Sequence, residues 1–154
     1  MKYEDLRISK LREYLFNVIN TLTEDRNYQI NADMLGKIDD FSLNKIPTEP
    51  EARPSWITGV KINKDVYSFR SRKAYSQDTI NNLKNIGFFE QLEDKINTNN
   101  DEGILPEIEN IESIECRSCG AMAINEDGTS SIFDITIQIT YRKEKEGGIS
   151  LWNL

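Results

Sequence analysis

The chain has 154 residues, of which 38% are hydrophobic and 29% are charged, and its formal net charge is −7 at pH 7. This length suits one domain that builds a core without disulfides or metals. The acidic balance gives nucleic-acid binding no electrostatic support. The absence of histidine excludes Ser-His-Asp and Cys-His catalysis, while carboxylate and lysine chemistry stay open.

No stretch approaches the roughly 18 consecutive apolar residues of a membrane-spanning helix. The first residues, Met-Lys-Tyr-Glu-Asp-Leu-Arg, are charged and lack the apolar region of a signal peptide. We therefore expect no membrane contact. We expect a protein that is made in the cytoplasm and leaves it, if at all, as part of a larger particle.

Residues 5–23 carry apolar side chains at helical spacing, among them Leu11, Leu15 and Val18, which predicts a first helix. Such a helix either covers a sheet or binds a partner, and the first interpretation is the more common. Residues 24–39 are polar and predict a loop or a short strand. Their aspartates do not have the spacing of an EF-hand calcium loop.

Phe41 and Leu43 alternate with polar residues, which predicts a short strand. The stretch 47–54 follows it and is acidic and rich in proline. Proline cannot supply regular ladder hydrogen bonds, so this stretch predicts an extended surface loop.

Residues 56–62 predict a strand, residues 63–65 a turn, and residues 66–72 the return strand of a hairpin. In the return strand Tyr67 and Phe69 share one face. Arg70 and Arg72 share the other, which we expect to be solvated or used for contacts.

Apolar residues between Ile80 and Ile96 recur at steps of three and four, which predicts a second helix that begins after Ser76. Gly87 lies inside this pattern and predicts a bend or two short helices. Residues 97–103 predict a polar exit from the helix. From Ile111 onward the pattern is that of strands, and Phe133 to Tyr141 alternate most clearly.

This order of elements predicts an α+β fold, with a mainly antiparallel sheet covered by two helices in a single compact domain. Residues 1–40 would form an N-terminal helix and loop, residues 41–142 the α+β core, and residues 143–154 a tail.

The chain carries few candidates for chemistry. Cys116 and Cys119 form a Cys-x-x-Cys pair, but a structural zinc site needs four ligands and no second pair exists. A zinc ion shared between subunits is the alternative. Glu112, Glu115 and Asp134 could pair for acid–base work, although nothing in the sequence fixes their spacing. We therefore predict no catalytic residue, no metal and no cofactor.

The stretch from Tyr67 to Ile108 carries several short motifs in sequence order. An aromatic strand leads into an Arg-x-x-Tyr segment within residues 67–76. Residues 85–88 then read Asn-Ile-Gly-Phe, and residues 103–106 read Gly-Ile-Leu-Pro. This stretch resembles the tail terminator, or minor capsid, proteins of tailed phages of Gram-positive bacteria. The closing strand, which ends at Tyr141, also looks like the terminal strand of that family.

The resemblance implies a fold of tail-terminator type and a structural protein of a virion or of a phage-tail-like bacteriocin (tailocin) with a contractile or non-contractile tail. Copies of the protein would close a hexameric ring at the head-proximal end of the tail tube and stop tube polymerisation. Its partners would be further copies, the tail tube protein, and the sheath and head connector proteins. The candidate contact residues are Trp56, Arg70, Arg72 and Tyr75.

Two other hypotheses stay open. The protein could be another connector, adaptor or head-completion protein at the same junction. It could also be an unrelated small enzyme that uses carboxylates.

Overall fold

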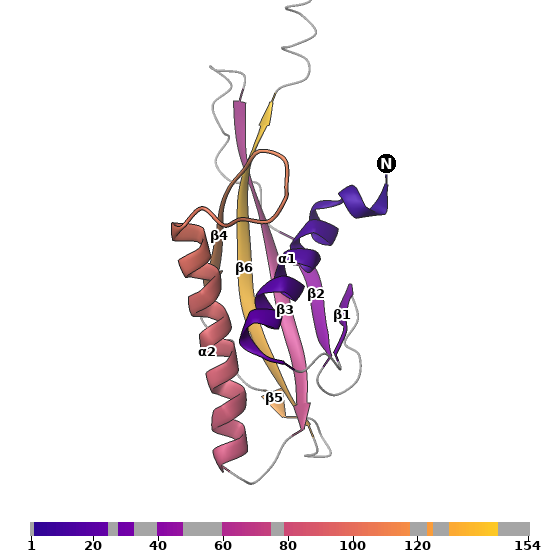
Figure 1. Cartoon of the computed structure of the whole chain (residues 1–154). Coiled ribbons are helices and arrows are strands. Elements are labelled where there is room, and N and C mark those ends of the chain that lie inside the picture. The colour runs from indigo at the N-terminus through magenta and orange to yellow at the C-terminus, as the bar shows by residue number, and fades with distance from the viewer. Residues whose placement is uncertain are drawn as a thin grey trace, which may run out of the picture.

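A mostly antiparallel sheet and two long helices make up the part of the chain that the computed structural model describes (Figure 1). The described residues are 2–24, 28–32, 40–47, 60–74, 79–117, 123–124 and 130–144. The strands are β1 (Ile30–Ala32), β2 (Phe41–Ile46), β3 (Val60–Ala74), β4 (Ile111–Arg117), β5 (Ala123–Ile124) and β6 (Ser130–Glu144). The helices are α1 (Arg7–Leu22) and α2 (Thr79–Asp101), and a short 3-10 turn, η1 (Tyr3–Asp5), precedes α1.

The strand order is β1-β2-β3-β6-β4, and β5 pairs with β6 off this path. Only the pairing of β1 with β2 is parallel among the described strands. The predicted α+β class, with a mainly antiparallel sheet and two helices in one compact domain, is confirmed.

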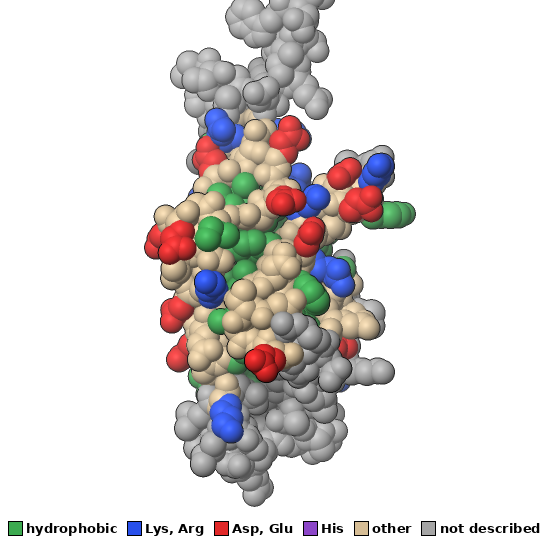
Figure 2. Space-filling view, in the orientation of Figure 1, with side chains coloured by type: hydrophobic (Ala, Val, Ile, Leu, Met, Phe, Trp, Pro, Cys, Tyr) green, Lys and Arg blue, Asp and Glu red, His purple; other side chains and the backbone are tan. Residues whose placement is uncertain are grey.

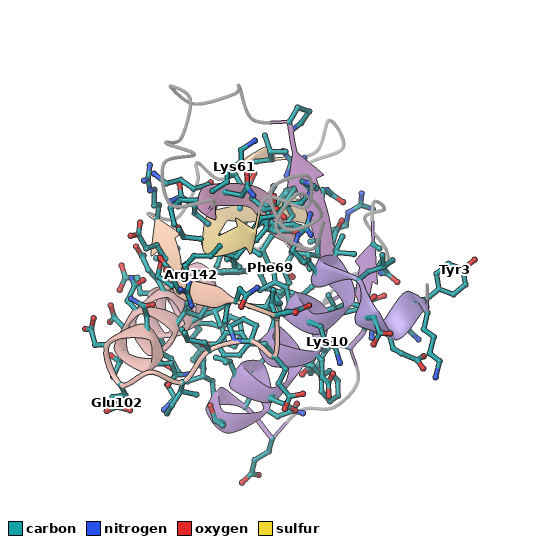
Figure 3. The ribbon with its side chains drawn as sticks, turned by 90° about the horizontal axis from the view of Figure 1, so that it is seen from above. Tyr3, Lys10, Lys61, Phe69, Glu102 and Arg142 are labelled. Atoms are coloured by element: carbon teal, nitrogen blue, oxygen red, sulfur yellow. The ribbon has the colours of Figure 1, made fainter. Side chains whose placement is uncertain are left out.

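Both helices lie on the same face of the sheet, which Figure 3 shows from above. Leu11, Leu15 and Ile19 are fully buried because a spacing of four residues aligns them on one side of α1. Phe69 lies between the sheet and the helices, where its ring stacks on Phe41 at a centroid distance of 4.9 Å (Figure 3). The first helix therefore contributes to the shared core, and the interpretation of a helix that covers a sheet is the correct one.

The long strands β3 and β6 form the centre of the sheet. They pair without a break from Val60 opposite Glu144 to Ala74 opposite Ser130. The predicted turn at residues 63–65 is therefore wrong. The three polar residues there are typical of a turn, but β6 offers a partner strand along their whole length, and this pairing overrides the local preference.

Helix α2 differs from the prediction in two ways. It runs through Gly87 as one continuous helix, so the predicted bend is wrong, and it continues to Asp101 through residues predicted to form the exit. It ends in a Schellman motif, in which Gly103 has a φ of +76° and the amide of Ile104 donates to the carbonyl of Asn99 at 2.8 Å. The glycine is needed there because positive φ disfavours residues with a side chain.

Candidate functional site

The face of the sheet that points away from α1 and α2, here called the outer face, carries two of the predicted contact residues. Arg70 lies opposite Asp134 in the register of β3 and β6. Its Nε donates to Oδ2 of Asp134 at 2.9 Å and to Oγ of Ser68 at 3.0 Å. The Ser68 hydroxyl in turn donates to Oδ1 of Asp134 at 2.8 Å. The Arg70 side chain is still 47% exposed, so its charge remains available to a partner.

Arg72 lies on the same face, opposite Ile132. Its Nε is buried and has no hydrogen-bond partner. A buried donor without an acceptor costs stability until a group supplies one. The sequence thus correctly placed both arginines on one face. Trp56 and Tyr75, the other two predicted contact residues, lie outside the described residues.

The β4 edge of the sheet is closed by side chains of α2. The side chain of Asn97 pairs with the backbone of Cys116: its Oδ1 accepts from the amide at 2.9 Å and its Nδ2 donates to the carbonyl at 3.1 Å. Oδ1 of Asn100 accepts from the amide of Ile114 at 2.9 Å. These side chains take the backbone groups that an added strand would need. The sequence does not predict this role for Asn97 and Asn100, because the polar run that contains them is typical of a helix exit. The spacing of three residues, which places both asparagines on one side of a helix, is the signal that could have indicated it.

On the opposite side of the sheet, the described strands pair over shorter stretches. Strand β1 pairs with only Phe41–Leu43 of β2, and β2 pairs with β3 only from Val66 onward. Residues Asn44–Ile46 of β2 and Val60–Asp65 of β3 therefore have no described strand on this side. We call these two segments the open flank.

The end of the sheet beside the open flank is basic. The last three pairs of β3 with β6 place Ile62 opposite Arg142, Lys61 opposite Lys143 and Val60 opposite Glu144. Nε of Arg142 also forms an ion pair with Oε1 of Glu112 at 3.0 Å. Like charges directly opposite each other weaken a strand pair. Ile62 is 43% exposed on the outer face, where its partner in β6 is Arg142. A cationic strand pair with an exposed isoleucine on an otherwise acidic protein is suited to contact an acidic partner surface.

Asp65 forms a buried polar centre beneath the first turn of α1. Its Oδ2 accepts from Nε of Arg7 at 2.9 Å and from the Tyr67 hydroxyl at 3.3 Å. Its Oδ1 accepts from the Tyr141 hydroxyl at 3.3 Å and lies 3.5 Å from Nζ of Lys45. The guanidinium of Arg7 also lies over the Tyr141 ring, 4.6 Å from its centroid.

The burial and charge around Asp65 shift the pKa values of the side chains that contact it. Burial, and secondarily the charge of Asp65, raise the pKa of the Tyr67 and Tyr141 phenols. Burial lowers the pKa of the Arg7 guanidinium, but the hydrogen bond to Asp65 and its charge outweigh burial, so that pKa is raised. Both carboxylate oxygens are already engaged by donors, which suits an anchor for α1 better than a general base.

The remaining candidates from the sequence are not brought together. Each of the three carboxylates pairs with a different arginine: Glu112 with Arg142, Glu115 with Arg117, and Asp134 with Arg70. Cys116 is buried at 5% exposure in β4, and Cys119 lies outside the described residues. Within the described ranges, no three or more Cys, Asp or Glu residues gather in a way that could hold a metal ion. Neither described helix has the length and apolar character needed to cross a membrane.

A scan of the chain against protein-family models finds no matching family, and a search of curated proteins finds no matching relative.

Proposed function

We propose that the protein is a structural assembly protein of tail-terminator type, which caps a tail tube as a ring, stops tube polymerisation and forms the junction toward the head. One observation carries the proposal: the described sheet has one edge closed by Asn97 and Asn100 and one open flank. Copies cannot join by pairing two β4 edges. Contacts that use the open flank against a different surface are head-to-tail, and head-to-tail contacts form a ring when the rotation between neighbours closes.

Two further features support a role in assembly. The outer face is polar and carries the Arg70–Asp134 ion pair in a position that a neighbouring molecule can reach. The buried carboxylate Asp65 has both oxygens occupied by donors, which disfavours the alternative in which it serves as a general base. The identity as a tail terminator rests on the sequence resemblance between Tyr67 and Ile108.

Deletion of the gene tests the proposal in particles. Without the protein, tail tubes should grow to uncontrolled lengths in electron micrographs, and the wild-type chain supplied in trans should restore one length. Tails of normal length in the deletion strain would refute a terminator. If a labelled copy of the chain lay at the head connector in micrographs and tail length were normal without the protein, the chain would be a connector or adaptor instead.

A charge exchange tests whether the outer face takes part. Arg70→Glu alone breaks the ion pair with Asp134, so its effect mixes folding with contacts. The double exchange Arg70→Glu, Asp134→Arg restores an ion pair within the chain but reverses the pattern that a neighbour meets. The double variant should keep the thermal stability of the wild type and lose tail-length control. If the double variant controlled tail length as well as the wild type does, the outer face would not take part in the contact.

A further inference from the structure

A pocket of about 370 Å³ opens between α1, α2 and residues 104–107, which follow α2. Val18, Leu105 and Pro106 supply apolar walls, and Tyr14 and Asn99 supply polar groups. Figure 2 shows hydrophobic side chains gathered between the two helices, with charged side chains around them. We call this the interhelical pocket. Its volume falls within the range of about 300–1,000 Å³ that is typical of small-ligand sites.

The polar side of this pocket is incomplete. Asn99 is only 4% exposed, and its Nδ2 donates to the Tyr14 hydroxyl at 3.3 Å. The Tyr14 hydroxyl donates onward to the carbonyl of Ile104 at 3.4 Å. Oδ1 of Asn99, however, is buried and has no hydrogen-bond partner. Buried acceptors without a donor are rare in folded proteins, so this oxygen points to a donor that the isolated chain does not supply.

The charges that line the pocket balance. Lys10 and Lys95 carry positive charge, and Glu13 and Glu107 carry negative charge. A ligand with a net charge would gain from one pair and lose to the other. The apolar walls and the balanced charges therefore favour a neutral ligand with an apolar body.

We propose that the interhelical pocket binds a compact, neutral, apolar group that bears one N–H or O–H donor, with an indole as the simplest example. The ring would lie against Leu105, Pro106 and Val18. Oδ1 of Asn99 has no accessible surface in the unliganded chain, so the Asn99 amide would turn about its Cβ–Cγ bond to accept from the N–H of the ring. Such a group could come from a free small molecule or from a tryptophan side chain of a polypeptide. This site is independent of the ring contacts proposed above, since it lies on the helical side of the sheet.

The test compares indole with indene, which has the same bicyclic shape but no N–H donor. Both are titrated into the full-length chain and followed by amide chemical shifts. Indole should shift the resonances of Asn99 and Leu105 and should bind about fivefold more tightly than indene, which is the ratio that a neutral hydrogen bond of about 1 kcal/mol gives.

Asn99→Leu removes the acceptor at nearly constant size. This variant should bind indole and indene equally. Thr98→Leu, at the exposed neighbouring position on α2, is the matched control and should keep the fivefold preference. If Asn99→Leu does not fold, Asn99→Ala tests the same acceptor, and the ligand pair on the wild type already tests the proposal without any substitution.

Three results would overturn the proposal: no saturable binding of indole, equal affinity of the wild type for both ligands, or shifts confined to residues outside the pocket. A second arm identifies the source of the group. A peptide of residues 149–154, Ile-Ser-Leu-Trp-Asn-Leu, is added to the indole complex. Displacement that is lost when the tryptophan is replaced by alanine supports a polypeptide donor, and persistence of bound indole supports a small molecule.

Discussion

Replacing Asp65 by alanine should release α1 from the centre of the sheet. The carboxylate joins Arg7, in the first turn of the helix, to Tyr67 and Tyr141 in β3 and β6. Its side chain is only 7% exposed. Alanine leaves these donors without their acceptor in a place that water reaches poorly.

The magnitude follows from how well each partner can be rehydrated. Tyr67 is 1% exposed, so its hydroxyl would stay unsatisfied at a cost of about 1–3 kcal/mol. The side chains of Arg7 and Lys45 are 45% and 51% exposed, so water would replace much of their interaction, well below the ~3–5 kcal/mol of a fully buried pair. We expect a total loss of about 3 kcal/mol, which lowers the melting temperature by roughly 6–12 °C for a domain of this size.

Urea unfolding followed by circular dichroism measures this loss as a change in the free energy of unfolding. Asp65→Asn keeps an oxygen that can still accept from one tyrosine and should lose about half as much. Glu115→Ala is the control, because Glu115 and Arg117 form an exposed pair at 3.9 Å that should contribute less than about 0.5 kcal/mol. If Asp65→Ala unfolded at the same urea concentration as the control, Asp65 would not anchor α1.

Three further predictions concern single positions. Gly87→Ala should raise the free energy of unfolding by about 0.5–1 kcal/mol, because an added Cβ meets no atom within 4 Å and glycine weakens a helix interior; an unchanged or lower melting temperature would contradict this. Asn97→Leu should cost about 2 kcal/mol, because two hydrogen bonds to Cys116 are lost, and should increase self-association seen by light scattering, whereas Thr98→Ala should do neither. The raised pKa of Tyr67 means that the folded state holds its proton more tightly than the unfolded state, whose pKa is near 10.0. The contribution of Tyr67 to stability should therefore be constant below about pH 10 and be lost as the pH rises through the folded pKa. The pKa values of Tyr14 and Tyr141 are raised as well, so Tyr67→Phe should reduce the alkaline fall in a pH series of melting temperatures without abolishing it.

The parts of the fold that were predictable are those where one face of an element is buried. The alternation from Phe133 to Tyr141 follows directly from a strand with one side against the helices, and all five odd-numbered residues there are buried. The stripe through Leu11 and Leu15 is the helical equivalent. In both cases the burial of one face gives the apolar residues a regular spacing, of two residues in the strand and of about 3.6 in the helix, which the sequence alone shows.

The errors arose where polar residues have partners that only the tertiary structure supplies. The sequence predicts a turn at Asp65 because a buried aspartate in a strand is rare. Its burial depends on the hydrogen bond from Arg7, which lies 58 positions away in the sequence. The sequence predicts a helix exit at Asn97 and Asn100, because it does not show that β4 lies beside the helix and bonds to these side chains. Arg70 and Arg72 were placed on one face correctly, but nothing in the sequence predicted that Nε of Arg72 would be buried without a partner.

The charges beside the open flank bear on whether copies form dimers or rings. A two-fold dimer through this flank would bring the same net positive segments of both copies together, since Asn44–Ile46 and Val60–Asp65 carry three lysines and one aspartate. Like charges at a strand interface are destabilising, so this symmetric contact is disfavoured. An unlike contact, between the basic flank and the acidic surface of the next copy, is favoured on a protein with a net charge of −7. Such a contact is head-to-tail by necessity, and it weakens with added salt because the charges that drive it are exposed. A ring that stayed assembled at high salt, or a stable dimer at low salt, would show that the flank does not make this contact.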